Sequence, residues 1–265
     1  MLLRYNQTPN ADFIGADFKY IARQLALRLS PAILFLLAWQ CSVADSNRLK
    51  FLFGSPSAIL VLALREYQSL AFWYDIYLTG AEALAGLILG SLLGTFAGTF
   101  LWLSPAIERH SRPYITCIGS IPIFSLAPLL IIWFGIGFTA KMFMAAFGVF
   151  VIALTHTIEG FRSSAQEHIA FARQLNASTF EIVSKILLPS ALRWLLTAPK
   201  INVGIALLGA FIGEFISSQA GLGHYIIQAG QTYNIPGVLF GVFNLTLLAL
   251  GFTGVISNLA RRYHD

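Results

Sequence analysis

Charged residues are scarce in this chain. Asp, Glu, Lys and Arg make up 11% of its 265 residues, whereas hydrophobic residues make up 57% and the mean hydropathy is +0.71. Soluble domains carry about 25% charged residues. The composition therefore argues against an ordinary soluble domain and indicates a protein embedded in a lipid bilayer.

Cysteine is nearly absent, because Cys41 and Cys117 are the two in the sequence and both fall within apolar runs. This excludes a disulfide framework and gives no support to a thiolate metal site. The histidines are scattered without the spacing of metal ligands, so we expect no bound metal. A membrane enzyme has little support, because no nucleophile and base come together in the sequence.

The sequence also lacks the features of a nucleic-acid-binding protein and of a protein that hydrolyses ATP. The basic residues, which give a net charge of +5, form no continuous patch with interleaved aromatic residues, so we expect no nucleic-acid partner. The phosphate-binding pattern G-x-x-x-x-G-K-S/T does not occur. Any ATP hydrolysis linked to this chain must therefore take place on a separate protein.

Long apolar runs dominate what is present. A transmembrane helix needs about 20 mainly apolar residues, and the runs lie near 29–44, 77–103, 115–134, 140–159, 195–216 and 236–259. They predict an all-α, polytopic membrane bundle of about six helices, with 1–28 as an N-terminal segment and 29–265 as the membrane domain. Between the first two runs, Gly54-Ser55-Pro56 marks a turn in a connecting loop over 45–75.

The first run has a second interpretation. Arg28 precedes it and the small residues Ser42-Val43-Ala44 follow it, as in a secretory signal peptide. We favour a membrane span, because the basic leader is long and further apolar runs follow.

Basic residues set the orientation. If the N-terminus is cytoplasmic, the outside segments carry only four of the 17 lysines and arginines, which are Arg48, Lys50, Arg65 and Lys141. Because short cytoplasmic loops are enriched in Lys and Arg, we expect both termini and the loop 161–194 to face the cytoplasm.

Glycines recur at every fourth residue of the second run, at Gly86, Gly90, Gly94 and Gly98. This spacing removes side chains from one stripe of a helix, so that another helix backbone can approach closely. The partner helix can belong to the same subunit or to a second copy.

The third run contains Pro122 and Pro128, which predict a broken or kinked helix. Irregular backbone at membrane depth is tolerated only inside protein or beside an aqueous cavity. Residues 120–133 are therefore candidates for a transport pathway, and a kink without contact to solute is the alternative.

The loop 161–194 contains the one extended amphipathic and charged segment between the apolar runs. Ile169, Ala172 and Leu175 share one face of a short helix, and Asn176-Ala177 follow as a turn. Ser178 and Glu181 form a capping-box pattern that starts a second helix. Its apolar stripe is Phe180, Val183, Ile186 and Leu187, and Pro189 predicts its end near Leu188.

Such short helices are marginal alone in water. Their apolar faces must therefore pack on the rest of this chain or on another protein. We favour a partner surface.

This segment resembles the cytoplasmic loop of the permease subunits of binding-protein-dependent ABC importers, whose pattern is E-A-A, three residues, Gly, nine residues, I-x-L-P. The register here is Ala170-Phe171-Ala172, Asn176 and Ile186-Leu187-Leu188-Pro189. Ala170 replaces the Glu, Phe171 the first Ala and Asn176 the Gly. Asn is the residue best able to replace Gly in a left-handed turn, and Glu167 lies one turn before Ala170.

More of the chain is similar to the subgroup of these permeases that serves nitrate, sulfonate, taurine and bicarbonate-like solutes. The features that carry this similarity are Leu103-Ser104-Pro105, Pro122, Pro128-Leu129, Ile132-Trp133-Phe134-Gly135-Ile136-Gly137, Asn176-Ala177-Ser178, Glu214 and Gly221-Leu222-Gly223. The resemblance covers about 100–260 and implies the type I ABC importer transmembrane-domain fold.

The resemblance also implies the partners. In the family the loop inserts into a cleft of an ATPase subunit that binds ATP and Mg. The residues in the matching position are Glu167, Ala170, Phe171, Ala172, Asn176, Ala177, Ser178, Ile186, Leu188 and Pro189. We accordingly expect a non-catalytic subunit of a bacterial inner-membrane transporter, with two ATPase copies, a second permease copy and an extracytoplasmic binding protein.

A small, anionic solute would then pass by alternating access between the two sides of the membrane. Phe124, Trp133, Asn202 and Glu214 are candidates for lining its pathway, with packing or anchoring at the interface as the alternative for the aromatic residues. A different class of transporter, coupled to protons or other ions, would instead use Glu82 and Glu214, because carboxylates within spans are functional candidates.

Overall fold

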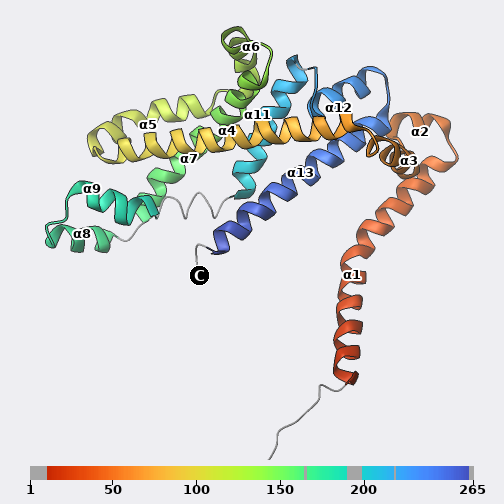
Figure 1. Cartoon of the computed structure of the whole chain (residues 1–265), viewed down its shortest axis with the longest axis horizontal. Coiled ribbons are helices and arrows are strands. Elements are labelled where there is room, and N and C mark those ends of the chain that lie inside the picture. The colour runs from red at the N-terminus through yellow and green to blue at the C-terminus, as the bar shows by residue number, and fades with distance from the viewer. Residues whose placement is uncertain (1–10, 164–165, 190–198, 218, 263–265) are drawn as a thin grey trace, which may run out of the picture. The chain divides into compact units, whose positions relative to one another are not determined.

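The computed structural model describes residues 11–163, 166–189, 199–217 and 219–262, and all the regular structure in these ranges is helical (Figure 1). The expected all-α class is therefore confirmed. The chain divides into two compact units, Met1–Val61 and Leu62–Asp265. The two units are described separately.

The first unit contains the long helix α1 (Ala11–Ala44), α2 (Asn47–Phe53) and the start of α3 (Pro56–Glu66). The division expected at residue 28 falls inside α1. Gly54, with φ of 66°, ends α2, and Pro56 starts α3, so the expected turn at Gly54-Ser55-Pro56 is confirmed.

Most of the region 45–75 is helical, where the sequence predicted a loop. The side chain of Ser46 caps α2 by accepting a hydrogen bond from the amide of Leu49 at 3.3 Å. Proline at the first helical position is pre-organised for α3. These two local signals start short helices. A search for apolar runs of membrane-spanning length does not detect helices of this size.

The second unit holds the other helices that the structure describes. They are α4 (Leu70–Trp102), α5 (Pro105–Gly119), α6 (Ile123–Phe134), α7 (Phe138–Ser163), α8 (Gln166–Gln174), α9 (Thr179–Ile182), the π-helix η1 (Val183–Leu187), α11 (Pro199–Ser217), α12 (Leu222–Gln231) and α13 (Ile235–Arg262). The largest buried cluster joins α4, α7 and α11 through Ala83, Leu87, Ala145, Val149 and Ala206, and α13 packs on it.

Four helical segments of the described residues are long and apolar enough to cross a membrane: Ala26–Ala44, Leu70–Trp102, Phe138–Arg162 and Ile235–Leu259. Two bent helix pairs bring the number up to six. They are Pro105–Gly119 with Ile123–Phe134, bent by 88°, and Ile201–Ser217 with Leu222–Gln231, bent by 47°.

The break in the third span lies at Pro122. This residue has extended backbone, with φ of −63° and ψ of 126°, and directly precedes α6. Pro128 lies inside α6 without ending it. Of the two prolines, Pro122 therefore marks the sharp bend.

The four glycines of α4 face α7 of the same chain. A Cβ added to Gly90 would collide with the backbone oxygen of Ala146, and one added to Gly94 with that of Phe150. At Gly86 and Gly98 the same atom would come within 2.8 and 2.9 Å of the carbonyl oxygens of Met142 and Leu154. Glycine thus allows α4 and α7 to pack backbone against backbone.

Candidate functional site

The hairpin formed by α8, α9 and η1, residues 166–189, contains the expected docking residues. Asn176 lies at its turn with φ of 56°, in the left-handed region that Asn tolerates better than most residues. The capping box is confirmed, because the Ser178 side chain accepts from the Glu181 amide while the Glu181 carboxylate accepts from the Ser178 amide at 3.0 Å. These bonds lower the pKa of Glu181 below its usual value.

The second helix of the hairpin contains a π-helix, Val183–Leu187, and its backbone is helical through Leu188 and Pro189. Its predicted end near Leu188 falls at the border of the described residues, because 190–198 lie outside them. A proline ring inside an α-helix clashes with the carbonyl four residues earlier. The wider turn before Pro189, in which the Leu188 amide bonds to the Val183 oxygen, changes the local geometry at this point.

One face of the hairpin packs on its own subunit. Ile182 and Leu187 are buried against Phe161 at the end of α7, and Trp102 at the end of α4 packs on the same cluster. The rings of Trp102 and Phe161 meet edge to face at 5.5 Å. Ile169, Ala172 and Ala177 also contact this cluster, so part of the expected apolar face is used within the chain.

The other face remains apolar and exposed. Phe171, Leu175 and Phe180, which lie on both sides of the turn, are exposed to 62%, 66% and 79%. Leu188 is exposed to 45%, and Ala170, Asn176, Ser178 and Pro189 are exposed as well. Ile186 is half-buried. The side chain of Glu167 lies outside the described residues.

An ion pair lies at the end of α7, next to Phe161, which packs on the hairpin. The carboxylate of Glu108 on α5 pairs with Arg162 on α7 and with Arg112 one turn further along α5, at 3.2 Å. The side chain of Glu108 is 10% exposed. No pattern in the sequence had indicated this contact.

Two glutamates of the bundle, Glu82 on α4 and Glu214 on α11, are completely buried. The ammonium group of Lys141 on α7 lies 3.0 Å from the Glu82 carboxylate, and all three groups interact electrostatically. Lys141, predicted outside the spans, is buried with them.

The N-terminus of α12 completes this cluster. The amides of Gly221, Leu222 and Gly223 donate hydrogen bonds to Asp75, Thr79 and Glu214 at 2.7, 2.8 and 2.7 Å. A Cβ on Gly221, whose φ is 107°, would collide with the Glu214 carboxylate. Side chains of two helices, α4 and α11, therefore satisfy backbone donors that the start of α12 leaves unpaired. These bonds fix the bend between α11 and α12.

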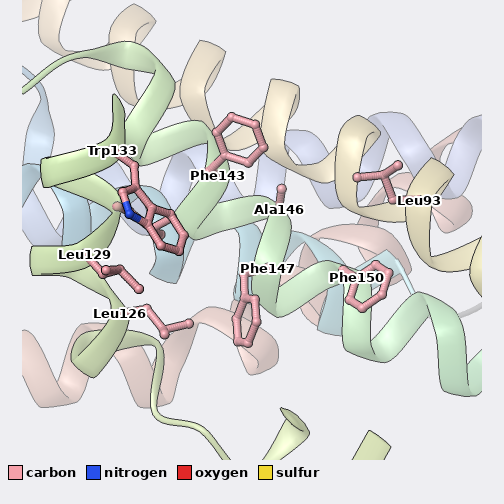
Figure 2. A pocket seen from close by; sticks show the side chains of 9 residues that line it. Leu93, Leu126, Leu129, Trp133, Phe143, Ala146, Phe147 and Phe150 are labelled. Carbon is pink, nitrogen blue, oxygen red and sulfur yellow. The ribbon is translucent and has the colours of Figure 1, made fainter. Parts of the chain in front are cut away.

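The predicted pathway residues are dispersed. Phe124 and Trp133 on α6 are exposed to 53% and 63%. Trp133 lines an apolar pocket of about 360 Å³, where Leu126 and Leu129 of α6 lie opposite Phe143 and Phe147 of α7 (Figure 2). The remaining lining residues are Leu93, Leu130, Ala146 and Phe150.

Asn202 and Glu214 have different surroundings. Asn202 is 3% exposed, and its side-chain oxygen has no hydrogen-bond partner among the residues that the structure describes. Glu214 is buried but contributes to the wall of a second, more polar pocket of about 310 Å³ beside α12, with Ser217, His224 and Gln231. The structure does not bring the four predicted residues together in one cavity of the described chain.

Comparisons with known proteins agree with this architecture. Residues 86–265 match the family described as binding-protein-dependent transport system inner membrane component. The chain is a permease of this family, which makes it a membrane component of an ABC importer.

Several relatives cover most of the chain. The riboflavin transport system permease protein RibX of Chloroflexus aurantiacus is 30% identical over 85% of this chain and 84% of its own length. The taurine transport system permease protein TauC of Escherichia coli is 25% identical over 86% and 85%.

Solved structures support the fold. A structure of the MetNI methionine ABC transporter in an inward-facing conformation matches with a TM-score of 0.66, covering 73% of this chain and 96% of the other at 21% identity. A bacterial ABC transporter for import of alginate matches with a TM-score of 0.62 over 94% and 98%. The expected type I importer fold is confirmed.

Proposed function

We propose that this chain is the permease subunit of an ATP-driven importer in the bacterial inner membrane. Its cytoplasmic hairpin docks on an ABC ATPase subunit, and ATP binding and hydrolysis there switch the membrane helices between outward and inward access. The chain itself catalyses no reaction in this scheme. Both termini lie in the cytoplasm, as the distribution of Lys and Arg favours.

The exposed apolar face of the hairpin carries this proposal. Large apolar side chains that water surrounds in an otherwise polar, cytoplasmic segment are typical of a protein interface. Phe171, Leu175 and Phe180 satisfy this description, while the opposite face of the same hairpin is already fixed to Trp102 and Phe161. A partner held at the exposed face would therefore be connected mechanically to α4 and α7.

The presence of one hairpin in each chain supports a transporter with two copies of the permease. Each chain has one hairpin, and an ATPase pair needs two docking elements. We propose a homodimer of permeases with two ATPase subunits, which bind the ATP and Mg. An extracytoplasmic binding protein would deliver the solute.

A small anionic solute is supported by the relatives named for taurine and for aliphatic sulfonates. The relative named for riboflavin shows a similar extent of coverage, so the cargo needs a direct test. The polar pocket beside α12 and the unpaired oxygen of Asn202 are the polar positions where a solute pathway has most support.

The test of docking compares two variants, each of which introduces one carboxylate at one of two neighbouring positions. Phe180→Asp puts a carboxylate in the exposed apolar face, whereas Thr179→Asp puts one on the adjacent exposed residue at the start of α9, where acidic residues are favoured. We expect the affinity-purified wild type and Thr179→Asp to retain ATP hydrolysis from a bound ATPase subunit. Phe180→Asp should lose it.

Measuring solute uptake by intact cells distinguishes ATP-driven transport from the alternative, ion-coupled transport. Ion-coupled transport through Glu82 and Glu214 has little support, because both carboxylates are already paired or hydrogen-bonded inside the bundle. Uptake that a protonophore abolishes while ATP depletion leaves it intact would contradict the proposal and favour ion coupling.

A further inference from the structure

Helix α5 is attached to the bundle close to its first turn. Ser104 caps its start, and Glu108 is the one side chain that is buried among the α5 residues that the structure describes. Burial of a carboxylate is costly unless a cation or hydrogen-bond donors compensate it. Arg162 of α7 and Arg112 of α5 both donate to the same carboxylate oxygen of Glu108.

Arg162 lies directly beside the part of α7 that supports the hairpin. Its neighbour Phe161 is 1% exposed and packs with Ile182 and Leu187 of the hairpin. Two consecutive residues of α7 therefore contact different elements, because Phe161 holds the hairpin and Arg162 holds α5. A displacement of the hairpin that tilts the end of α7 must also move the guanidinium group that binds Glu108.

The opposite end of α5 leads into the broken span. After Gly119, whose added Cβ would lie 3.0 Å from Val151 of α7, the chain bends by 88° and enters α6. Ala127 of α6 is packed with Met144 of α7 and Ile212 of α11. With 15 residues, α5 is about 22 Å long, so a small rotation near Glu108 displaces the bend by a larger distance.

We propose that the Glu108–Arg162 ion pair is a positioning contact that transmits displacement of the hairpin through α5 to the α5–α6 bend. The inference rests on the proposed function, since the displacement comes from the docked ATPase subunit. The pair between Glu108 and Arg112 lies within one helix and cannot transmit motion between helices. This difference between two arginines on one carboxylate makes the inference testable.

The experiment uses the complete complex of permease and ATPase subunits in lipid nanodiscs. Cys117 lies on α5 and is exposed, so it can carry an environment-sensitive fluorophore after Cys41→Ser removes the other cysteine. The fluorescence change on adding ATP, Mg and vanadate then reports movement of α5. Copurified ATPase subunit is quantified in the same samples.

We expect Arg162→Gln to retain the ATPase subunit but to reduce the fluorescence change by about fivefold, the lower end of typical allosteric coupling. Arg112→Gln removes the bond within α5 and should respond like the wild type. Arg162→Lys keeps the positive charge and should restore much of the response. Glu108→Gln, which alters α5 rather than α7, should reproduce the loss seen with Arg162→Gln.

Equal responses of Arg162→Gln and the wild type would overturn the inference and leave the docking proposal intact. If Arg162→Gln and Glu108→Gln both release the ATPase subunit, the pair only stabilises the docking surface and the inference is also overturned. A wild-type chain that holds no ATPase subunit would contradict the proposed function itself, and the inference with it.

Discussion

The hydroxyl group of Thr79 on α4 donates a hydrogen bond of 2.6 Å to the carboxylate of Glu214 on α11, and both side chains are completely buried. The same hydroxyl oxygen accepts a hydrogen bond from the backbone amide of Leu222. One small side chain therefore joins α4 to α11 and to the first turn of α12. Thr79 is thus central to the bend between α11 and α12.

Replacing Thr79 by Val should destabilise the protein. The substitution keeps the shape but leaves the Leu222 amide without its acceptor, and an unsatisfied buried group costs about 1–3 kcal/mol. We expect a lower midpoint of thermal unfolding in detergent. The matched control is Thr99→Val, because the hydroxyl bond that the structure describes for Thr99 is to the Thr95 carbonyl within its own helix. Equal midpoints for both variants would contradict the assigned role of Thr79.

The buried ion pair between Lys141 and Glu82 predicts which of two substitutions destabilises the protein more. Lys141→Met leaves the carboxylates of Glu82 and Glu214 facing each other, whereas Glu82→Gln leaves Lys141 beside Glu214. Breaking a buried pair costs about 3–5 kcal/mol, and we expect Lys141→Met to cost more than Glu82→Gln. The double variant should be less destabilised than the sum of the two single variants. Unfolding in detergent measures all three, and additive effects would argue against a direct interaction.

The glycine contact between α4 and α7 predicts a contrast between two substitutions of the same kind. Gly90→Ala forces a methyl group against the Ala146 carbonyl and should cost about 1–3 kcal/mol, as overpacking does. Gly251→Ala on α13 meets no atom within 4 Å and should be neutral or stabilising by up to about 1 kcal/mol, because Ala favours helix. A thermal midpoint of Gly90→Ala that equals that of Gly251→Ala would show that the two helices can separate without loss.

The capping box predicts a pH dependence of the hairpin. Its bonds to Ser178 lower the pKa of Glu181, so the carboxylate stabilises the folded hairpin fully at pH above the ordinary value of 4.5. That contribution is lost as the pH falls through the lower, folded-state pKa. Amide hydrogen exchange of 178–182, corrected for intrinsic rates, should show protection that decreases in this acidic range.

Glu181→Gln is the control for this titration, because the amide oxygen can still accept a hydrogen bond but does not ionise. Its protection should be weaker than that of the wild type at neutral pH and should lack the acidic decrease. A decrease of the same size in the variant would assign the effect to another group.

Local signals in the sequence were sufficient for most of the helices and for the turn of the hairpin. Apolar runs predicted the membrane spans, Pro122 predicted the break before α6, and Ser178 with Glu181 predicted the start of α9. Each of these features is determined by residues within a few positions of one another. The helices α2 and α3 were missed because they are far shorter than a span and the surrounding residues contain turn formers.

Contacts between distant residues could not be predicted in the same way. The Thr79, Glu214 and Leu222 contacts join residues more than a hundred positions apart, except where Glu214 meets the nearby Gly223. Buried glutamates within spans were a signal that something must compensate their charge, but nothing in the sequence identified Lys141 as that partner. The division of the hairpin into a packed face and an exposed face likewise depends on where Trp102 and Phe161 lie.

The four glycines of α4 restrict how α4 and α7 can move relative to each other. Because its backbone rests directly on that of α7, sliding one past the other would drive carbonyl oxygens into Cα atoms at four successive turns. We therefore expect these two long helices to move together. The proposed change of access would then involve mainly α5 and α6, which are joined by a bend of 88° and of which α5 has one buried side chain among its described residues.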